Sequence, residues 1–188
     1  MIGYAMCGSF CTLRRSMEIL AALCDSYDVL PIMSHMTYGT DTRFGHAEEF
    51  IRQAEDLCGH KVIHTIEAAE PLGPAQPLDA LVICPCTGNT LAKLSRGITD
   101  TPVCMAAKAH LRSDRPLVIA LASNDAMSAN LGNIATLLNR KQVYFVPLYQ
   151  DDPKHKPHSL VADFSKVIPA LKAAMDGTQL RPLFLSDP

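Results

Sequence analysis

The stretch VICPCTGNTLAK, residues 82–93, carries the polar side chains best placed to do chemistry, because an apolar run gives way there to small polar residues. Pro85 has no amide hydrogen for a sheet ladder, so we expect a strand to end at that point. Thr87, Asn89 and Thr90 then place three hydrogen-bonding side chains within four positions. A helix cap needs only one of them. The surplus favours a site for the polar edge of a planar heteroaromatic ring, and a plain capped helix is the alternative.

A second candidate site is the stretch CGSFCT, residues 7–12. Gly8 allows a tight turn, Ser9 has a hydroxyl to donate, and the amides near Phe10 and Thr12 open a helix. Free amides at a helix N-terminus attract phosphate. The alternative is an ordinary strand-to-helix turn with Thr12 as the N-cap. Neither GxGxxG nor GxxxxGK[ST] is present, so nicotinamide and ATP sites of the usual kinds are not expected.

Two further loops have the same character, SHMTYGT at residues 34–40 and ASNDAMS at residues 122–128. Each of the four polar loops follows a predicted strand. The carboxyl ends of parallel strands meet at one edge of a sheet, and ligands bind there in open α/β folds. We therefore expect the four loops to converge on one site.

The pattern along the chain predicts strands alternating with helices. Strands are expected at residues 1–6, 28–34, 61–66, 80–85, 116–122 and 142–148, and helices at 13–23, 41–59, 91–98, 103–113, 128–140 and 158–177, the last with Pro169 as a potential kink. Residues 67–79 read as a loop. The alternation predicts a three-layer, doubly wound α/β fold with a parallel sheet. We expect a single domain over residues 1–188, in which 150–188 form a C-terminal loop and helix.

Composition narrows the class of protein. The 188 residues are 48% hydrophobic and 19% charged, which fits a globular protein, and the net charge of -2 gives no reason to expect nucleic acid as a partner. No apolar run reaches the roughly 20 residues of a membrane span, and the opening residues do not resemble a secretory signal. The seven cysteines form an odd number without CxxC spacing, so we expect free thiols, a reducing compartment and no metal site.

Two long segments resemble a known family. LVICPCTGNTLAKLSRGITD, residues 81–100, and RPLVIALASNDAMSANLGNIATLLNRKQVYFVPL, residues 115–148, resemble the flavoprotein superfamily of flavin prenyltransferases and cysteine decarboxylases. SFCTLRR, AAEPLGP and QDDPKHKPHSLVADF are similar, in combination, to the dipicolinate synthase B subunits of endospore-forming bacteria. The resemblance covers nearly the whole chain. It implies a flavodoxin-like fold, an FMN cofactor, and a homo-oligomer that is a trimer or a dodecamer.

The resemblance also implies which residues hold the flavin. They are Gly8, Ser9, Phe10 and Thr12 in the first loop, Ser34 after the second strand, Thr87, Gly88, Asn89 and Thr90 in the central motif, and Asn124 and Ala126 after the fifth predicted strand. In this family the serine after the second strand contacts the phosphate.

The chain departs from its enzyme relatives at three places. Decarboxylases of the family carry a catalytic His ahead of the central strand and a Cys in a C-terminal flap, but EPLGPAQPLDA holds no His and no Cys follows Cys104. Prenyltransferases carry an Arg-Glu pair where this chain has ALASNDAMS. Decarboxylation and prenyl transfer are therefore disfavoured. A flavin-binding oxidoreductase subunit is the leading interpretation, and the alternatives are a decarboxylase or prenyltransferase homologue and an assembly subunit that has lost the flavin.

The B-subunit resemblance implies oxidation of dihydrodipicolinate to dipicolinate during sporulation, in the mother-cell cytoplasm, with an A subunit that uses NAD or NADP. A dicarboxylate substrate calls for cations, and Arg43 is the leading candidate because a guanidinium pairs with both oxygens of a carboxylate. Lys154, His155, Lys156 and His158 are further candidates, or simply a solvated loop. His35 and His46 are candidate acids or bases, and the pattern does not choose between them.

Overall fold

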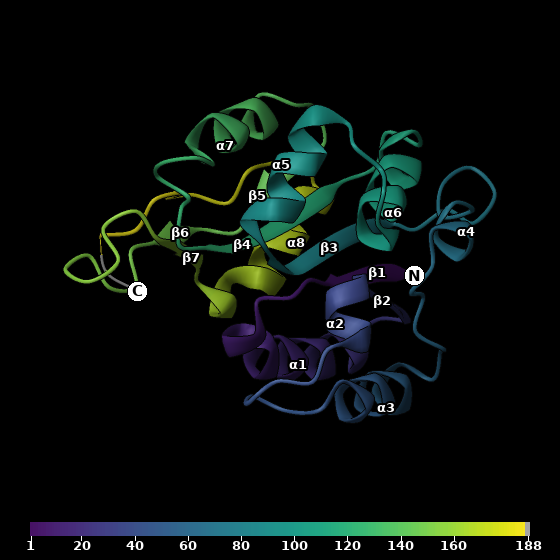
Figure 1. Cartoon of the computed structure of the whole chain (residues 1–188). Helices are drawn as coiled ribbons and strands as arrows, with labels where there is room; N and C mark the ends of the chain where they lie inside the picture. Colours follow the sequence, from purple (N-terminus) through teal and green to yellow (C-terminus); the bar gives the residue numbers. More distant parts are fainter. Residues whose placement is uncertain (187–188) are drawn as a thin grey trace.

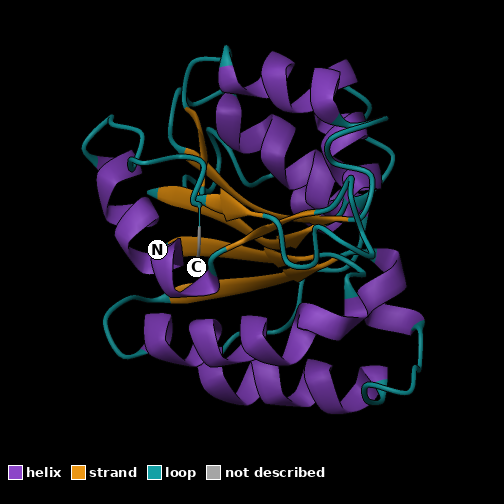
Figure 2. Ribbon diagram, turned by 90° about the vertical axis from the view of Figure 1, so that its left-hand side faces the viewer, coloured by secondary structure: helices purple, strands orange, loops and turns teal. Residues whose placement is uncertain are grey.

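A seven-stranded sheet lies between two layers of helices in the computed structural model, which describes residues 1–186 (Figures 1 and 2). The strands are β1 (Ile2–Met6), β2 (Val29–Met33), β3 (Ala80–Cys86), β4 (Leu117–Ser123), β5 (Val143–Phe145), β6 (Leu148–Tyr149) and β7 (Leu160–Ala162). Strands β1 to β5 are parallel and lie in the order β2-β1-β3-β4-β5. This confirms the predicted doubly wound α/β fold.

The helices cover both faces of the sheet. They are α1 (Phe10–Cys24), α2 (His35–Gly39), α3 (Ala47–Cys58), α4 (Ile66–Ala69), α5 (Gly88–Arg96), α6 (Pro102–Leu111), α7 (Leu131–Leu138), the 3-10 turn η1 (Phe164–Lys166) and α8 (Val167–Met175). Helix α1 packs with α3 and α8, whereas α5 packs with α6 and α7 (Figure 1). No helix within the described residues has both the length and the apolar character needed to span a membrane.

The two central strands are buried at every position, as their sequences predict. Strand β3 reads ALVICPC and β4 reads LVIALAS, and both lack the alternation of a half-exposed strand because helices cover them on each side. Pro85 does not end β3, which continues to Cys86. The register to β4 instead shifts between Ile83 and Cys86, across the residue that has no amide hydrogen.

Strand β4 divides the sheet into two branches, which the sequence did not predict. Its first half, Leu117–Ile119, pairs with β5, and its end at Ala122 and Ser123 pairs with the antiparallel strand β7. The predicted strand 142–148 is split into β5 and β6, because Pro147 interrupts it between them. The predicted helix 158–177 is also wrong at its start, since residues 160–162 pair with β4 and helix α8 begins only at Val167. This branch places the loop 150–159 beside the end of β4.

Three further predictions need correction. Residues 61–66 do not form a strand; Ile63 makes only an isolated bridge with Ile32, and α4 begins at Ile66 and extends into the predicted loop 67–79. The predicted helix 41–59 begins at Ala47, because a turn closed by Thr42 and Gly45 occupies the preceding residues. Its end at Gly59, in the left-handed conformation, is as predicted.

Candidate functional site

The carboxyl ends of β1, β3 and β4 surround a cavity of about 520 Å³. This volume lies in the range of about 300–1,000 Å³ that is typical of small-molecule sites. The lining combines backbone, hydroxyl, amide and charged groups. The lining residues are Gly8, Ser9, Phe10, Cys11, Thr12, Arg43, Phe44, Thr87, Gly88, Asn89, Ala122, Ser123, Asn124, Asp125, Asp151, Lys156 and Val161.

The N-terminus of α1 opens onto this cavity without a capping group of its own. Ser9 is the N-cap residue, but its side chain makes no capping hydrogen bond, and the first turn holds no acidic residue. Thr12 is not the N-cap; its hydroxyl lies 2.9 Å from the carbonyl oxygen of Ser9 and 3.0 Å from Oγ of Ser9. A 15-residue helix with an uncapped N-terminus presents amide hydrogens and a positive dipole end. It can therefore receive an anionic group.

The three polar residues that open α5 have three different roles. Thr87 is the N-cap, and its hydroxyl accepts the amide hydrogen of Thr90 at 3.3 Å. The Thr90 hydroxyl lies 3.3 Å from the buried sulfur of Cys7 and so points into the core. The side chain of Asn89 is exposed, lines the cavity and makes no hydrogen bond within the described residues. Only Asn89 therefore has both its amide donor and its acceptor free for a ligand.

A polar cluster formed by Ser123, Asp125 and Asn130 lies against the first residue of α5. Oδ1 of Asp125 accepts hydrogen bonds from Oγ of Ser123 and, at 3.0 Å, from Nδ2 of Asn130. A β-carbon on Gly88 would lie 2.6 Å from that Nδ2 atom, so only glycine allows this approach. The hydrogen bond from Ser123 lowers the pKa of Asp125, burial opposes the shift, and Asn130 lowers it further. Asp125 is thus held as a carboxylate.

Sequence reasoning misses this cluster. The motif ASNDAMS stands out for its small polar residues, and the family resemblance points to Asn124 in it rather than to Asp125. Asn130 lies outside the motif, and only the turn before α7 brings it back against Asp125, through hydrogen bonds of the Ser128 and Asn130 amides to the Asp125 carbonyl. The one available signal is an acidic residue, Asp125, two positions after the buried strand β4.

Two cations from different loops line the cavity. Arg43 comes from the turn before α3, where its guanidinium lies 4.8 Å from the centre of the Phe44 ring. Lys156 comes from the loop 150–159, and its Nζ lies 2.8 Å from Oδ2 of Asp151. Burial raises the pKa of Asp151, but hydrogen bonds from Lys156 and Ser159 outweigh it and hold the value below its usual range. The other cationic candidates of this loop, Lys154, His155 and His158, do not line the cavity.

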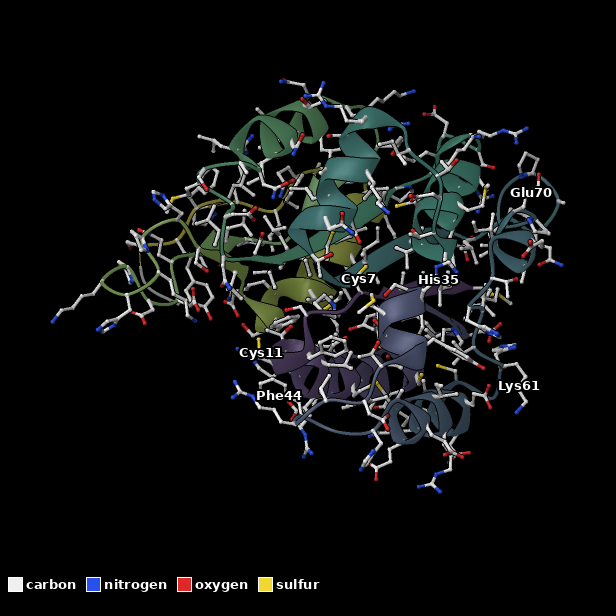
Figure 3. The ribbon with its side chains drawn as sticks, viewed as in Figure 1. Cys7, Cys11, His35, Phe44, Lys61 and Glu70 are labelled. Atoms are coloured by element: carbon white, nitrogen blue, oxygen red, sulfur yellow. The ribbon has the colours of Figure 1, made fainter. Side chains whose placement is uncertain are left out.

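Several residues that the sequence selected lie outside the cavity lining. Ser34 caps α2, where its hydroxyl accepts the amide hydrogen of Thr37 at 3.2 Å. His35 is exposed on α2, and Figure 3 shows it away from Cys11 and Phe44, which lie together at the cavity. His46 precedes α3 and pairs with Asp41 at 3.2 Å, a contact that raises the pKa of His46. The remaining two, Thr90 and Ala126, are buried.

The cysteines are free thiols, most of them buried in the core or half-buried. Burial raises the pKa of Cys7 and of Cys84 to about 12. Cys11 is exposed and lines the cavity. Within residues 1–186, no three His, Cys, Asp or Glu side chains are grouped closely enough to hold a metal ion.

Comparison with known proteins places this architecture in a family. The Flavoprotein family profile matches residues 2–170. The chain is 39% identical over 187 residues to the dipicolinate synthase B subunit of Bacillus subtilis (strain 168), covering 99% of this chain and 94% of that protein. The crystal structure of the dipicolinate synthase B subunit from Bacillus halodurans superposes with a TM-score of 0.91 at 36% identity, covering 100% of this chain and 96% of that one.

A more distant match is the FMN-dependent cysteine decarboxylase SpaF. It has a TM-score of 0.68 at 25% identity, over 92% of this chain and 95% of that one. The profile match and the two matches to dipicolinate synthase extend over almost all of the sequence. The chain therefore belongs to the flavoprotein family and, within it, to the family of dipicolinate synthase B subunits.

Proposed function

We propose that this chain is the flavin-binding B subunit of a dipicolinate synthase, which works with an NAD- or NADP-dependent A subunit to oxidise dihydrodipicolinate to dipicolinate during sporulation, in the mother-cell cytoplasm. The observation that carries the proposal is the cavity at the carboxyl edge of the sheet. It is bounded by the N-terminus of α1 and by the side-chain amide of Asn89 on α5, which makes no hydrogen bond to any residue that the structure describes. The similarity to proteins named as the B subunits of dipicolinate synthases supports the choice of reaction.

The residues present fit an FMN group. The two helix N-termini in the cavity differ in charge, because α1 has no acidic residue in its first turn whereas the Asp125 carboxylate lies against the start of α5. A phosphate would therefore be held at α1, by the amides that follow Ser9 and by the Ser9 hydroxyl. The flavin ring would lie toward Gly88, Asn89 and Asn124, which line the cavity at the start of α5 and after β4.

The rest of the lining suits a dicarboxylate substrate. Bound FMN would supply a ring that accepts two electrons, while the protein positions the reactants and tunes the electrostatics around them. Arg43 and Lys156 would bind the substrate carboxylates, with Arg43 able to engage both oxygens of one group. Asp151 keeps Lys156 charged and limits its movement. These contacts orient the substrate ring in the cavity.

We propose that the group that takes up or releases a proton during the reaction joins the site only when the subunits assemble. No histidine is among the described residues that line the cavity. His35 and His46 stay sequence-based candidates, and neither lines the cavity of this chain. We propose that the A subunit completes the site, and that the B chain forms a homo-oligomer, a trimer or a dodecamer, with the flavin close to the boundaries between protomers.

Reconstitution tests this function. The purified chain is mixed with FMN and desalted, and retained flavin is measured by absorbance; an A-type partner and dihydrodipicolinate are then added. We expect flavin to stay bound and oxidation to require both FMN and the partner. Oxidation that needs the partner but is indifferent to FMN would leave an assembly role only. Release of carbon dioxide from a C-terminal cysteine peptide or from a pantothenoyl-cysteine substrate would instead identify a decarboxylase.

A further inference from the structure

The two oxygens of the Asp125 carboxylate differ in the hydrogen bonds that they accept from the described residues. Oδ1 accepts from Ser123 and Asn130, whereas Oδ2 has no hydrogen-bond partner within the described residues. Asp125 is exposed and lines the cavity. We infer that Asp125 determines ligand specificity: its free oxygen accepts a hydrogen bond from the N3–H group of the flavin ring, an inference that rests on the function proposed above.

The cluster around Asp125 is built to hold this acceptor still. Ser123 is 9% exposed and Asn130 is 5% exposed, so both donors are fixed by packing. Oδ1 of Asn130 in turn accepts from Nδ2 of Asn133 at 3.0 Å, and Oδ1 of Asn133 accepts from the Ser95 hydroxyl at 2.8 Å. This chain of hydrogen bonds links the carboxylate to both α7 and α5. A carboxylate tethered through one oxygen presents the other in a defined direction.

The charge of Asp125 selects the kind of group that can approach it. An ionised carboxylate only accepts hydrogen bonds, so it rejects phosphate and carboxylate groups and favours an N–H donor. The oxidised flavin ring has one such ring group, N3–H, between two carbonyl groups. The unpaired amide of Asn89, on the adjacent first turn of α5, is able to donate to a flanking carbonyl. Asp125 and Asn89 together therefore match the pyrimidine edge of the flavin.

The position of Asp125 also explains why two helix N-termini in one cavity do not compete for the phosphate. A negative charge at the start of a helix is stabilised by the helix dipole and offsets the positive potential of that end. Because Gly88 has no side chain, the Asp125 carboxylate can lie against the start of α5. Oδ1 of Asp125 is 2.9 Å from the position that a β-carbon on Gly88 would take. The first turn of α1 itself holds no acidic residue. The ligand is thus oriented with its anionic end at α1 and its N–H edge at α5.

The test compares FMN with its N3-methyl derivative as ligands of the full-length chain. Dissociation constants are measured by quenching of flavin fluorescence, for the unmodified protein, for Asp125→Asn and for Asp176→Asn, an exposed carboxylate at the end of α8 that lines no part of the cavity. We expect the unmodified protein and Asp176→Asn to bind the N3-methyl derivative about 10- to 100-fold more weakly than FMN. Asp125→Asn should bind FMN about 10-fold more weakly and discriminate less than 3-fold between the two.

The outcomes distinguish a failure of the role inferred for Asp125 from a failure of the proposed function. Equal affinity of the unmodified protein for both flavins would overturn the role of Asp125, and this measurement needs no variant to fold. Undiminished discrimination by Asp125→Asn would overturn it as well. Failure of the unmodified protein to bind FMN at all would instead overturn the proposed function, and the role of Asp125 with it.

Discussion

Gly88 and Asn130 approach so closely that a β-carbon on Gly88 would lie 2.6 Å from Nδ2 of Asn130. We expect Gly88→Ala to push Asn130 and Ser123 away from Asp125 and to destabilise the fold by about 1–3 kcal/mol through overpacking. Urea unfolding measures this change. Gly132→Ala on α7 is the matched control, since open space surrounds it, and it should raise stability by about 0.5–1 kcal/mol. A Gly88→Ala protein as stable as the parent would contradict the close packing.

Asn89 has an exposed side chain at the start of α5 and no partner to lose within the described residues. Asn89→Leu should therefore raise the dissociation constant of FMN about 3- to 10-fold, the value of one neutral hydrogen bond, while the free energy of unfolding changes by less than about 0.5 kcal/mol. Gln76→Leu, an exposed amide outside the cavity, serves as the control. Unchanged flavin affinity for Asn89→Leu would count against the site.

Arg43 and Lys156 are the cations of the cavity. Replacing either by Gln should raise KM for dihydrodipicolinate about 10-fold, with a smaller change in kcat, because binding of the substrate carboxylates persists from ground state to transition state. Steady-state kinetics with the A-type partner checks this. Arg52→Gln, on the exposed side of α3, should leave KM unchanged. A loss confined to kcat would assign these cations a role other than substrate binding.

His110 on α6 is fully buried, with Nε2 2.9 Å from the Pro116 carbonyl oxygen, and its Nδ1 has no hydrogen-bond partner among residues 1–186. Burial lowers its pKa below the usual 6.5, and the nearby Arg115 acts in the same direction. As the pH falls through 6.5, His110 becomes protonated in the unfolded chain but stays neutral in the folded chain. The free energy of unfolding therefore falls toward acid pH. His110 contributes at most about 1.4 kcal/mol per pH unit to the slope of the free energy of unfolding against pH.

Urea unfolding between pH 5 and 8, compared with His110→Gln, isolates this contribution. Above about pH 7 the two proteins should show the same pH dependence. Below that range the parent should lose stability more steeply than the variant. Parallel curves over the whole range would show that His110 accepts a proton without cost in the folded state.

Cys24 and Cys58 end α1 and α3, and their sulfur atoms lie 3.7 Å apart. We expect diamide to take two hydrogens from this pair and form a disulfide that dithiothreitol reverses, detected by peptide mapping. Burial raises the pKa of both thiols, so oxidation should be faster at pH 9 than at pH 7. Cys58→Ser should abolish the bridge and Cys11→Ser should not. Recovery of residues 24 and 58 as separate reduced peptides would refute the pairing.

The sequence by itself determined the central part of this fold. Continuous apolar runs such as residues 80–84 and 117–122, bounded by turn residues, are typical of strands covered on both faces, and their alternation with helices favours a parallel sheet. The polar loops after β1, β3 and β4 were therefore predictable as neighbours, and Ser9, Thr87, Asn89 and Asn124 do line one cavity, whereas Ser34 after β2, predicted for the same site, does not. These are consequences of local pattern and of the direction of parallel strands.

Only the tertiary structure decided which side chains point into the cavity. Thr90 is two positions from Gly88 but turns toward Cys7, because successive helical residues face different directions. A turn brings Asn130 against Asp125. Lys156 reaches the cavity because the end of β4 pairs with β7, the strand that follows the loop carrying Lys156. Such contacts depend on pairing between distant segments, and a segment such as Leu160–Ala162 suits a strand or a helix until the neighbouring strand is present.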